Sequence, residues 1–272
     1  MLARTWARTQ KDPDRMTNPV TQFFRTRAHQ YMLRRWNAAA REAETADLFD
    51  LRDIGLRAKQ MRDRADRVSH IADSRLAMPR VGSNAILKPV GSDWAVRPEL
   101  WSGPITPKGL VAAKNKSPLG RSVTLFHDCP LSEVTMRQVR NMHESDLAPY
   151  GLRMDVFRFE GSFLSLVLDV PKDGLAGLQR RHILRVDTRI ETEKPLEVFA
   201  RLNIKHGPNV EQVVRELPMK KDGPAVEFDL AHTGISEKRL ERIWLDLIFE
   251  RPEMNEIYLR DLTLSRRPRA EF

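Results

Sequence analysis

Cysteine is nearly absent from this chain of 272 residues, which contains a single one, Cys129. One cysteine allows no internal disulfide, so a reducing compartment such as the cytoplasm is the simplest location. Long apolar runs are absent as well, and no stretch approaches the roughly 18 apolar residues that a membrane-spanning helix needs. The first ten residues do not contain the apolar core of a secretory signal, which again predicts a cytoplasmic protein.

The motifs of several enzyme classes are also missing. The sequence contains no Gly-rich phosphate loop, no G-x-S-x-G elbow and no dinucleotide fingerprint. It has neither zinc-type spacing of Cys and His nor an EF-hand loop. His127 and Cys129 fall on one face of an expected strand, where they would suit a nucleophile pair, but Asp128 between them points the other way and orients neither. A binding protein is therefore favoured over an enzyme, and catalysis stays open.

Positive charge is concentrated at the N-terminus. The net charge is +9, and residues 1–41 hold nine Lys or Arg against two Asp. This basic arm, residues 4–41, is compatible with nucleic acid, with an anionic membrane, or simply with a solvated surface. Its aromatic residues interleave with the arginines and match no named nucleic-acid motif.

Two helices are expected in the N-terminal region. Residues 20–46 contain no helix breaker, and their apolar face is mixed with arginines. In residues 51–72, apolar side chains step alternately by three and four, which is a heptad seam. The seam consists of Leu51, Ile54, Ala58, Met61, Ala65, Val68 and Ala72. It favours a helical hairpin with residues 20–46, and the alternative is self-association through an intermolecular coiled coil.

Residues 77–121 contain six Pro and five Gly, which excludes regular helix. Trp94 and Trp101 are unusual in such a segment, because disordered linkers contain few aromatic residues. We therefore expect the segment to run over the neighbouring domain and to bury both indole rings.

From residue 122 onward, apolar and polar residues alternate in short runs separated by turn signals such as Asp173-Gly174 and Gly207-Pro208. The strands are expected near 122–127, 133–140, 152–160, 162–170, 181–192, 196–206, 210–217, 225–231, 241–250 and 256–265. The fold class is thus α+β by segment, with a helical hairpin followed by a mainly antiparallel, jelly-roll-like β-sandwich. The expected domains are residues 1–76, 77–121 and 122–272.

Alternation also divides each late strand into an inner and an outer face. If these strands share one sheet, its outer face gathers charged, amide and aromatic side chains, which suit the stacking and paired hydrogen bonds that a sugar needs. The candidate ligand-binding residues are Arg185, Asp187, Phe199, Arg201, Asn203, Trp244 and Asp246. The alternatives are a solvated face with cross-strand ion pairs and a protein interface.

Four stretches resemble an uncharacterised alphaproteobacterial family, a domain of unknown function, which implies no activity. They are residues 124–130, 158–165, 199–209 and 259–268. The closing strands also resemble those of carbohydrate-binding-module sandwiches. That resemblance implies a structural calcium held by Asp261, and no other cofactor is expected. The predicted function is non-enzymatic binding, with a glycan as the ligand, and the alternative is an assembly protein that associates through its N-terminal helices and basic arm.

Overall fold

The structure is a computed structural model that describes residues 19–77, 83, 85–219 and 223–269. It divides into two compact units, residues 1–66 and 67–272, and the division falls within the second helix. Arg4, Arg8, Lys11 and Arg15 of the basic arm lie outside the described residues. Among the described residues, no helix combines the length and the hydrophobicity needed to cross a bilayer. The domain boundaries expected from the sequence stay predictions.

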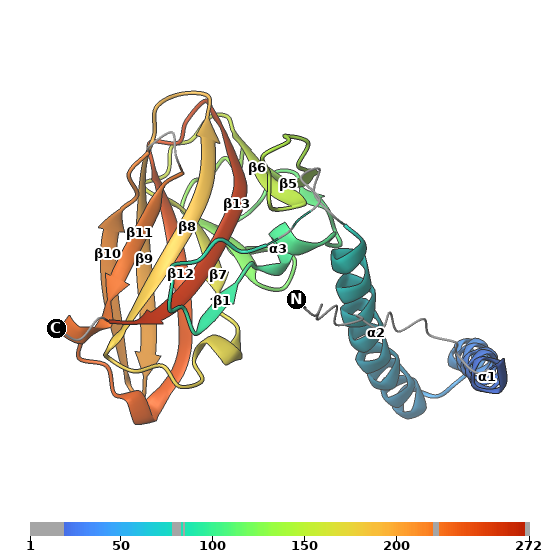
Figure 1. Ribbon diagram of the computed structural model, residues 1–272. Coiled ribbons are helices and arrows are strands. Elements are labelled where there is room, and N and C mark those ends of the chain that lie inside the picture. Colours follow the sequence, from blue (N-terminus) through green and yellow to red (C-terminus); the bar gives the residue numbers. More distant parts are fainter. Residues whose placement is uncertain (1–18, 78–82, 84, 220–222, 270–272) are drawn as a thin grey trace, which may run out of the picture. The chain divides into compact units, whose positions relative to one another are not determined.

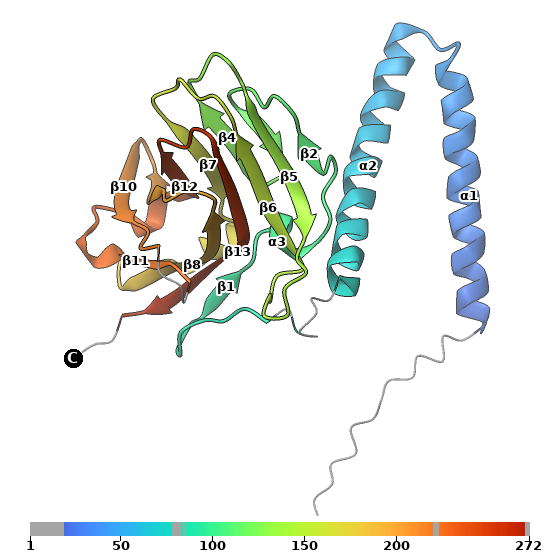
Figure 2. The same cartoon turned by 90° about the horizontal axis from the view of Figure 1, so that it is seen from above.

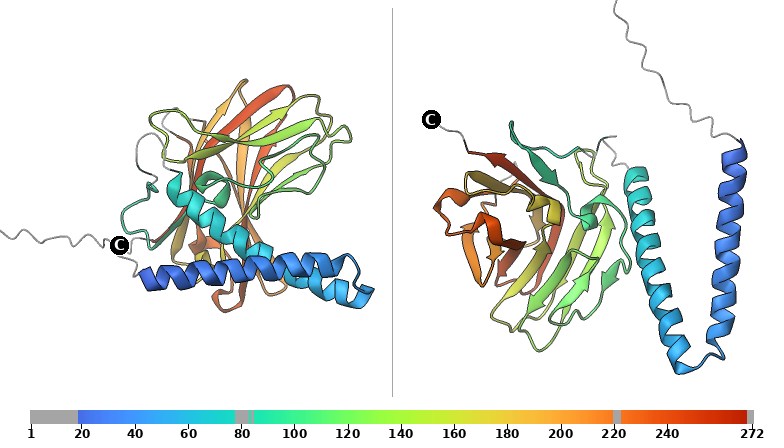
Figure 3. Two further views of the ribbon diagram at one scale, coloured as in Figure 1. Left: turned by 90° about the vertical axis from the view of Figure 1, so that its right-hand side faces the viewer. Right: turned by 90° about the horizontal axis from the view of Figure 1, so that it is seen from below.

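The N-terminal unit contains α1 (Pro19–Ala43) and the first part of α2 (Leu48–Leu76). The two helices run in opposite directions from the short connection between them (Figures 2 and 3). A groove of about 480 Å³ separates them, lined by Met32 and Trp36 from α1 and by Ile54 and Met61 from α2. No described residue of α2 is buried. The helix pair is therefore confirmed. Ile54 and Met61 of the heptad seam face α1 across the groove, and no seam residue is fully buried.

The second unit is a sandwich of two antiparallel sheets (Figure 1). Sheet A has the order β11-β8-β13-β6-β5-β2, and β1 also pairs with β13. Its strands are β1 (Trp94–Val96), β2 (Gly109–Leu110), β5 (Val134–Arg140), β6 (Tyr150–Val156), β8 (His182–Thr192), β11 (Ala225–Asp229) and β13 (Asn255–Pro268). Sheet B has the order β10-β9-β12-β7-β4-β3. Its strands are β3 (Ser117–Leu119), β4 (Val123–His127), β7 (Leu164–Asp169), β9 (Glu197–His206), β10 (Asn209–Glu216) and β12 (Leu240–Glu250).

The core lies between the two sheets and follows the alternation of the sequence. Leu202, Ile204, Leu245 and Leu247 are completely buried, as expected for the inner faces of β9 and β12. Each such side chain contributes about 1.5–3 kcal/mol of burial free energy relative to an exposed one. The predicted sandwich and its register in these strands are confirmed.

From Trp94 onward, the segment 77–121 belongs to the sandwich. Its short helix α3 (Glu99–Ser102) buries Trp101 completely, and the indole Nε1 donates to the carbonyl of Leu259 at 2.9 Å. The amide of Gln138 donates to the carbonyls of Leu100 and Gly103, so the backbone of this turn is hydrogen-bonded inside the protein. Trp94, in contrast, is only partly buried.

Candidate functional site

The predicted site residues separate into two groups, because β8 belongs to sheet A whereas β9 and β12 belong to sheet B. Arg185 and Asp187 lie on β8 and pair with each other at 2.7 Å, and Arg185 also reaches Glu227 at 3.3 Å. The expectation that they share a face with Trp244 is therefore wrong. Consecutive strands of a sandwich often change sheet, and alternation gives the face of a residue without giving its sheet.

The other five predicted residues do lie together on the outer face of sheet B. Arg201 is directly opposite Asp246 in the register between β9 and β12, and Asn203 is opposite Trp244. Phe199 is opposite Ile248, one row further along the strands. Residues directly opposite each other on neighbouring antiparallel strands have side chains close enough to interact.

A depression of about 530 Å³ lies on this face. Its lining comes from β4, β7, β9 and β12, with Phe163 just before β7. It consists of Thr124, Phe126, Phe163, Ser165, Val167, Asp169, Arg201, Arg242, Trp244, Asp246 and Ile248. No residue of the segment 77–121 is among them. Within that segment, β3 pairs with β4 at the edge of sheet B, while β1 and β2 pair with sheet A.

Asp246 forms the polar floor of the depression. Asp246 is only 2% exposed. Arg201 donates to Asp246 Oδ2 from Nε at 2.8 Å, and its Nη2 lies 2.6 Å from the same oxygen. Asn203 Nδ2 adds a third donor to that oxygen at 3.1 Å. Gln212 on β10 in turn donates to Asn203 Oδ1 at 2.9 Å, which fixes the orientation of the amide.

Aromatic side chains flank this floor. The guanidinium of Arg242 sits 4.9 Å from the centre of the Trp244 ring and donates to Asp169 Oδ1 at 2.8 Å. Trp244 is only partly buried and lines the depression, so this cation–π contact leaves part of the indole exposed there. Phe163 on the rim is 40% exposed.

The turn before β7 holds Phe163 in place. Asp128 accepts hydrogen bonds from the backbone of Ser162 at 2.8 Å and of Phe163 at 3.2 Å, and from the Ser162 hydroxyl at 2.6 Å. The hydroxyl bond, followed by the two backbone bonds, holds the pKa of the Asp128 carboxyl below its usual value. A Cβ atom at Gly161 would lie 2.5 Å from Asp128 Oδ1, so the close approach requires glycine.

Sequence reasoning missed the half of the site that β4 and β7 contribute. Alternation along these strands places Thr124 with Phe126, and Ser165 with Asp169, on single faces. The missing information was that β7 pairs with β12 and β4 with β7. The β7–β12 pairing joins residues about 80 positions apart and the β4–β7 pairing joins residues about 40 apart, so neither leaves a local signal.

Asp261, the predicted calcium ligand, lies on the other sheet. Arg97 donates from Nε to one carboxylate oxygen at 2.8 Å and from Nη2 to the other at 2.9 Å. The guanidinium thus occupies the position in which a bound cation would be expected. Among the residues that the structure describes, no group of three or more His, Cys, Asp or Glu is arranged to hold a metal ion.

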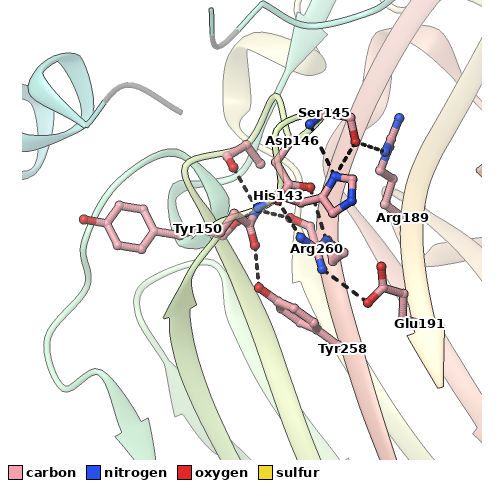
Figure 4. Close-up of polar contacts among 10 residues, drawn as sticks. His143, Ser145, Asp146, Tyr150, Arg189, Glu191, Tyr258 and Arg260 are labelled. Atoms are coloured by element: carbon pink, nitrogen blue, oxygen red, sulfur yellow. Dashed lines mark hydrogen bonds and ion pairs between the residues drawn. The ribbon is translucent and has the colours of Figure 1, made fainter. Parts of the chain in front are cut away.

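A second polar cluster, on the outer side of sheet A, is fully connected (Figure 4). Arg260 donates to Asp146 from Nε at 3.2 Å and from Nη2 at 2.6 Å, and its pKa is raised chiefly by this bond. The Tyr258 hydroxyl donates to Asn141 at 2.6 Å. Burial raises the pKa of that phenol. Because these groups satisfy one another and join β13 to the loop before β6, we assign the cluster a structural role.

Fold and site together define a β-sandwich protein with an aromatic-lined depression on the outer face of one sheet. The chain belongs to the DUF6478 family, a family of unknown function, which it matches over residues 16–272. No curated protein matches it in sequence.

Several solved structures have a distantly similar fold. A family 11 carbohydrate-binding module from Clostridium thermocellum, in complex with a β-1,3-1,4-mixed-linked tetrasaccharide, is 8% identical with a TM-score of 0.38, covering 58% of this chain and 96% of that one. A putative sugar-binding protein from Bacteroides thetaiotaomicron is 12% identical with a TM-score of 0.34, covering 61% and 96%. The enzymatically active domain of tailspike protein 4 from bacteriophage CBA120 is 7% identical with a TM-score of 0.37, and the match covers 52% of this chain and 19% of that one. Similarities of this size carry no argument about a ligand.

Proposed function

We propose that this protein binds a carbohydrate, without cleaving it, in the depression on the outer face of sheet B. The observation that carries the proposal is the combination of Trp244, Phe126 and Phe163 with the buried carboxylate of Asp246 in one depression. Its volume of about 530 Å³ lies within the roughly 300–1,000 Å³ usual for small-ligand sites. Aromatic rings offer apolar stacking surfaces, and a buried carboxylate offers strong hydrogen-bond acceptors.

The charges in the depression support binding rather than hydrolysis. Most glycosidases need two carboxyl groups, one of which carries a proton that it donates to the leaving oxygen. The carboxylates that line the depression are Asp246 and Asp169, and each pairs with an arginine, Arg201 and Arg242 respectively. Each of the two is therefore already engaged in an ion pair, and neither stands as a free catalytic carboxyl group.

Replacing Trp244 by alanine tests the proposal. On an array of immobilised glycans, the wild-type chain is expected to bind a subset, and Trp244→Ala should weaken that binding about tenfold or more through loss of stacking area. Folding should be kept, because Trp244 lies on the outer face and its inward neighbours Ile243 and Leu245 form the core.

Phe157→Ala is the matched control, since Phe157 is 51% exposed and does not line the depression. Equal losses in both variants, or no binding of the folded wild-type chain to any glycan, would contradict the proposal.

The second candidate function is assembly through the N-terminal helices. Leu51 is 39% exposed, Met61 37% and Val68 67%, so seam positions on α2 offer apolar surface to a partner. A second copy of the chain supplies the same seam. Packing two seams together would stabilise α2, because helices in proteins gain most of their stability from tertiary packing of an amphipathic face. For either function we propose a cytoplasmic location, which the single cysteine supports.

A further inference from the structure

Asp246 is hydrogen-bonded in an uneven way. Arg201 Nε, Arg201 Nη2 and Asn203 Nδ2 all point to its Oδ2 atom. Its Oδ1 atom is buried and has no hydrogen-bond partner. One oxygen of this carboxylate therefore has three donors and the other has none.

Some other Arg–Asp pairs in the described residues share the two carboxylate oxygens between two guanidinium nitrogens. Arg97 and Asp261 do so at 2.8 and 2.9 Å. Arg260 and Asp146 do so at 3.2 and 2.6 Å (Figure 4). This two-pronged geometry is the usual one for arginine and carboxylate. The Arg242–Asp169 pair, like Arg201–Asp246, instead places both guanidinium nitrogens on one oxygen. Both of these pairs line the depression, and there Asp246 Oδ1 is buried without a partner.

A second unpartnered polar atom lies beside it. Ser165 Oγ is buried without a hydrogen-bond partner, and Ser165 also lines the depression. Val167 lies directly opposite Asp246 in the register, so Ser165, two residues earlier on β7, is its diagonal neighbour on the same face. Diagonal neighbours on antiparallel strands are roughly 7–8 Å apart, which is within the span of one six-membered ring with its substituents. Buried polar atoms without partners are unfavourable, so a ligand that supplies hydroxyls would gain from both.

We propose that Asp246 Oδ1 and Ser165 Oγ are the two hydrogen-bonding positions for hydroxyls of a neutral sugar ring. This inference rests on the proposed function and adds the class of sugar. A carboxylate oxygen only accepts hydrogen bonds, so Asp246 Oδ1 selects a hydroxyl donor over a carboxylate, sulfate or phosphate, whose oxygens would also offer only lone pairs. Arg201 and Arg242, which would otherwise attract an anion, already pair with Asp246 and Asp169.

The test uses three neutral hexasaccharides with gluco, manno and galacto units and their counterparts oxidised at C6 to uronic acids. Each matched pair differs only in the carboxylates. Titration calorimetry on the full chain should show at least a tenfold preference for the neutral member of any pair that binds. Asp246→Asn places an amide N–H where Oδ1 was, so it should reduce that preference at least tenfold.

Ser165→Ala should weaken binding of the neutral hexasaccharide about fivefold, the effect of one ordinary hydrogen bond. The same variant should not lower the thermal midpoint of the free protein, because the lost hydroxyl had no partner. Thr188→Val is the matched control: its buried hydroxyl donates to the carbonyl of Pro224 at 3.0 Å on sheet A. That variant should lower the thermal midpoint and leave binding unchanged. Asp187→Asn, which is also on sheet A, should leave binding unchanged as well.

The outcomes distinguish a failure of the preference for neutral sugars from a failure of carbohydrate binding itself. Binding of the wild-type chain to both members of a pair with equal affinity, or more tightly to the uronic acid, overturns the inference and leaves carbohydrate binding standing. Equal effects of Ser165→Ala and Thr188→Val on affinity also overturn it. Failure of the folded chain to bind any of the six probes overturns the proposed function and this inference together.

Discussion

Removing the carboxylate of Asp261 should destabilise the sandwich strongly. The side chain of Arg97 is 5% exposed and the side chain of Asp261 is 17% exposed, so the pair is largely withdrawn from water. In Asp261→Ala, Arg97 keeps its hydrogen bond to the carbonyl of Ala85 at 3.2 Å and loses both bonds to the carboxylate. Breaking one side of a buried ion pair costs about 3–5 kcal/mol.

Urea unfolding at pH 7 measures this cost, and a double-mutant cycle isolates the pair. Asp261→Leu and Arg97→Met should each be strongly destabilising, whereas the double variant should lie within about 1 kcal/mol of the wild type, since apolar residues of similar size often replace a buried pair without loss. Calcium or a chelator should leave the wild-type midpoint unchanged. A cost of Asp261→Ala below about 1 kcal/mol, or a midpoint lowered by the chelator, would refute the assignment of Asp261 to an ion pair.

Two further predictions concern pH and association. Burial, followed by the nearby charge of Arg266, lowers the pKa of the His182 imidazole, so protonation favours the unfolded chain. The free energy of unfolding should therefore decline as pH falls below 6.5, the ordinary pKa of histidine. His182→Asn should flatten this part of the curve in urea titrations from pH 7.5 to 5, and an unchanged slope would contradict the reasoning. In sedimentation equilibrium, the intact chain should self-associate at micromolar concentration, and the substitutions Leu51→Lys and Met61→Lys should make it monomeric. Leu56→Lys, which lies off the seam, should leave the association unchanged. A monomeric wild type would argue against assembly.

The elements of the late chain could be predicted because each strand alternates with a period of two. The run expected at 241–250 is β12 at Leu240–Glu250, and the run expected at 196–206 is β9 at Glu197–His206. Alternation also placed Arg201, Asn203, Trp244 and Asp246 correctly on one outer face. These features depend on local pattern alone, which a sequence records directly.

Sheet membership could not be predicted, because it depends on pairings between distant segments. β8 follows the same alternation as β9, yet it pairs with β11 and β13. The partner of Asp261 is 164 residues away in the chain. A carboxylate on a strand looks the same in sequence whether it faces a cation, a ligand or an arginine from another segment. Short strands such as β2, with two residues, also carry too little pattern to be recognised.

The burial of Trp101 bears on how the sandwich can be produced as a separate fragment. The segment 77–121, which was expected to run over the neighbouring domain, contributes Leu100, Trp101, Ile105 and Leu119 to the interior. Through β1 the same segment also pairs with β13. A recombinant fragment that starts at residue 122 would lack these side chains and expose the apolar surfaces they cover, an aggregation liability during expression. A fragment for crystallisation or spectroscopy should therefore begin before residue 94.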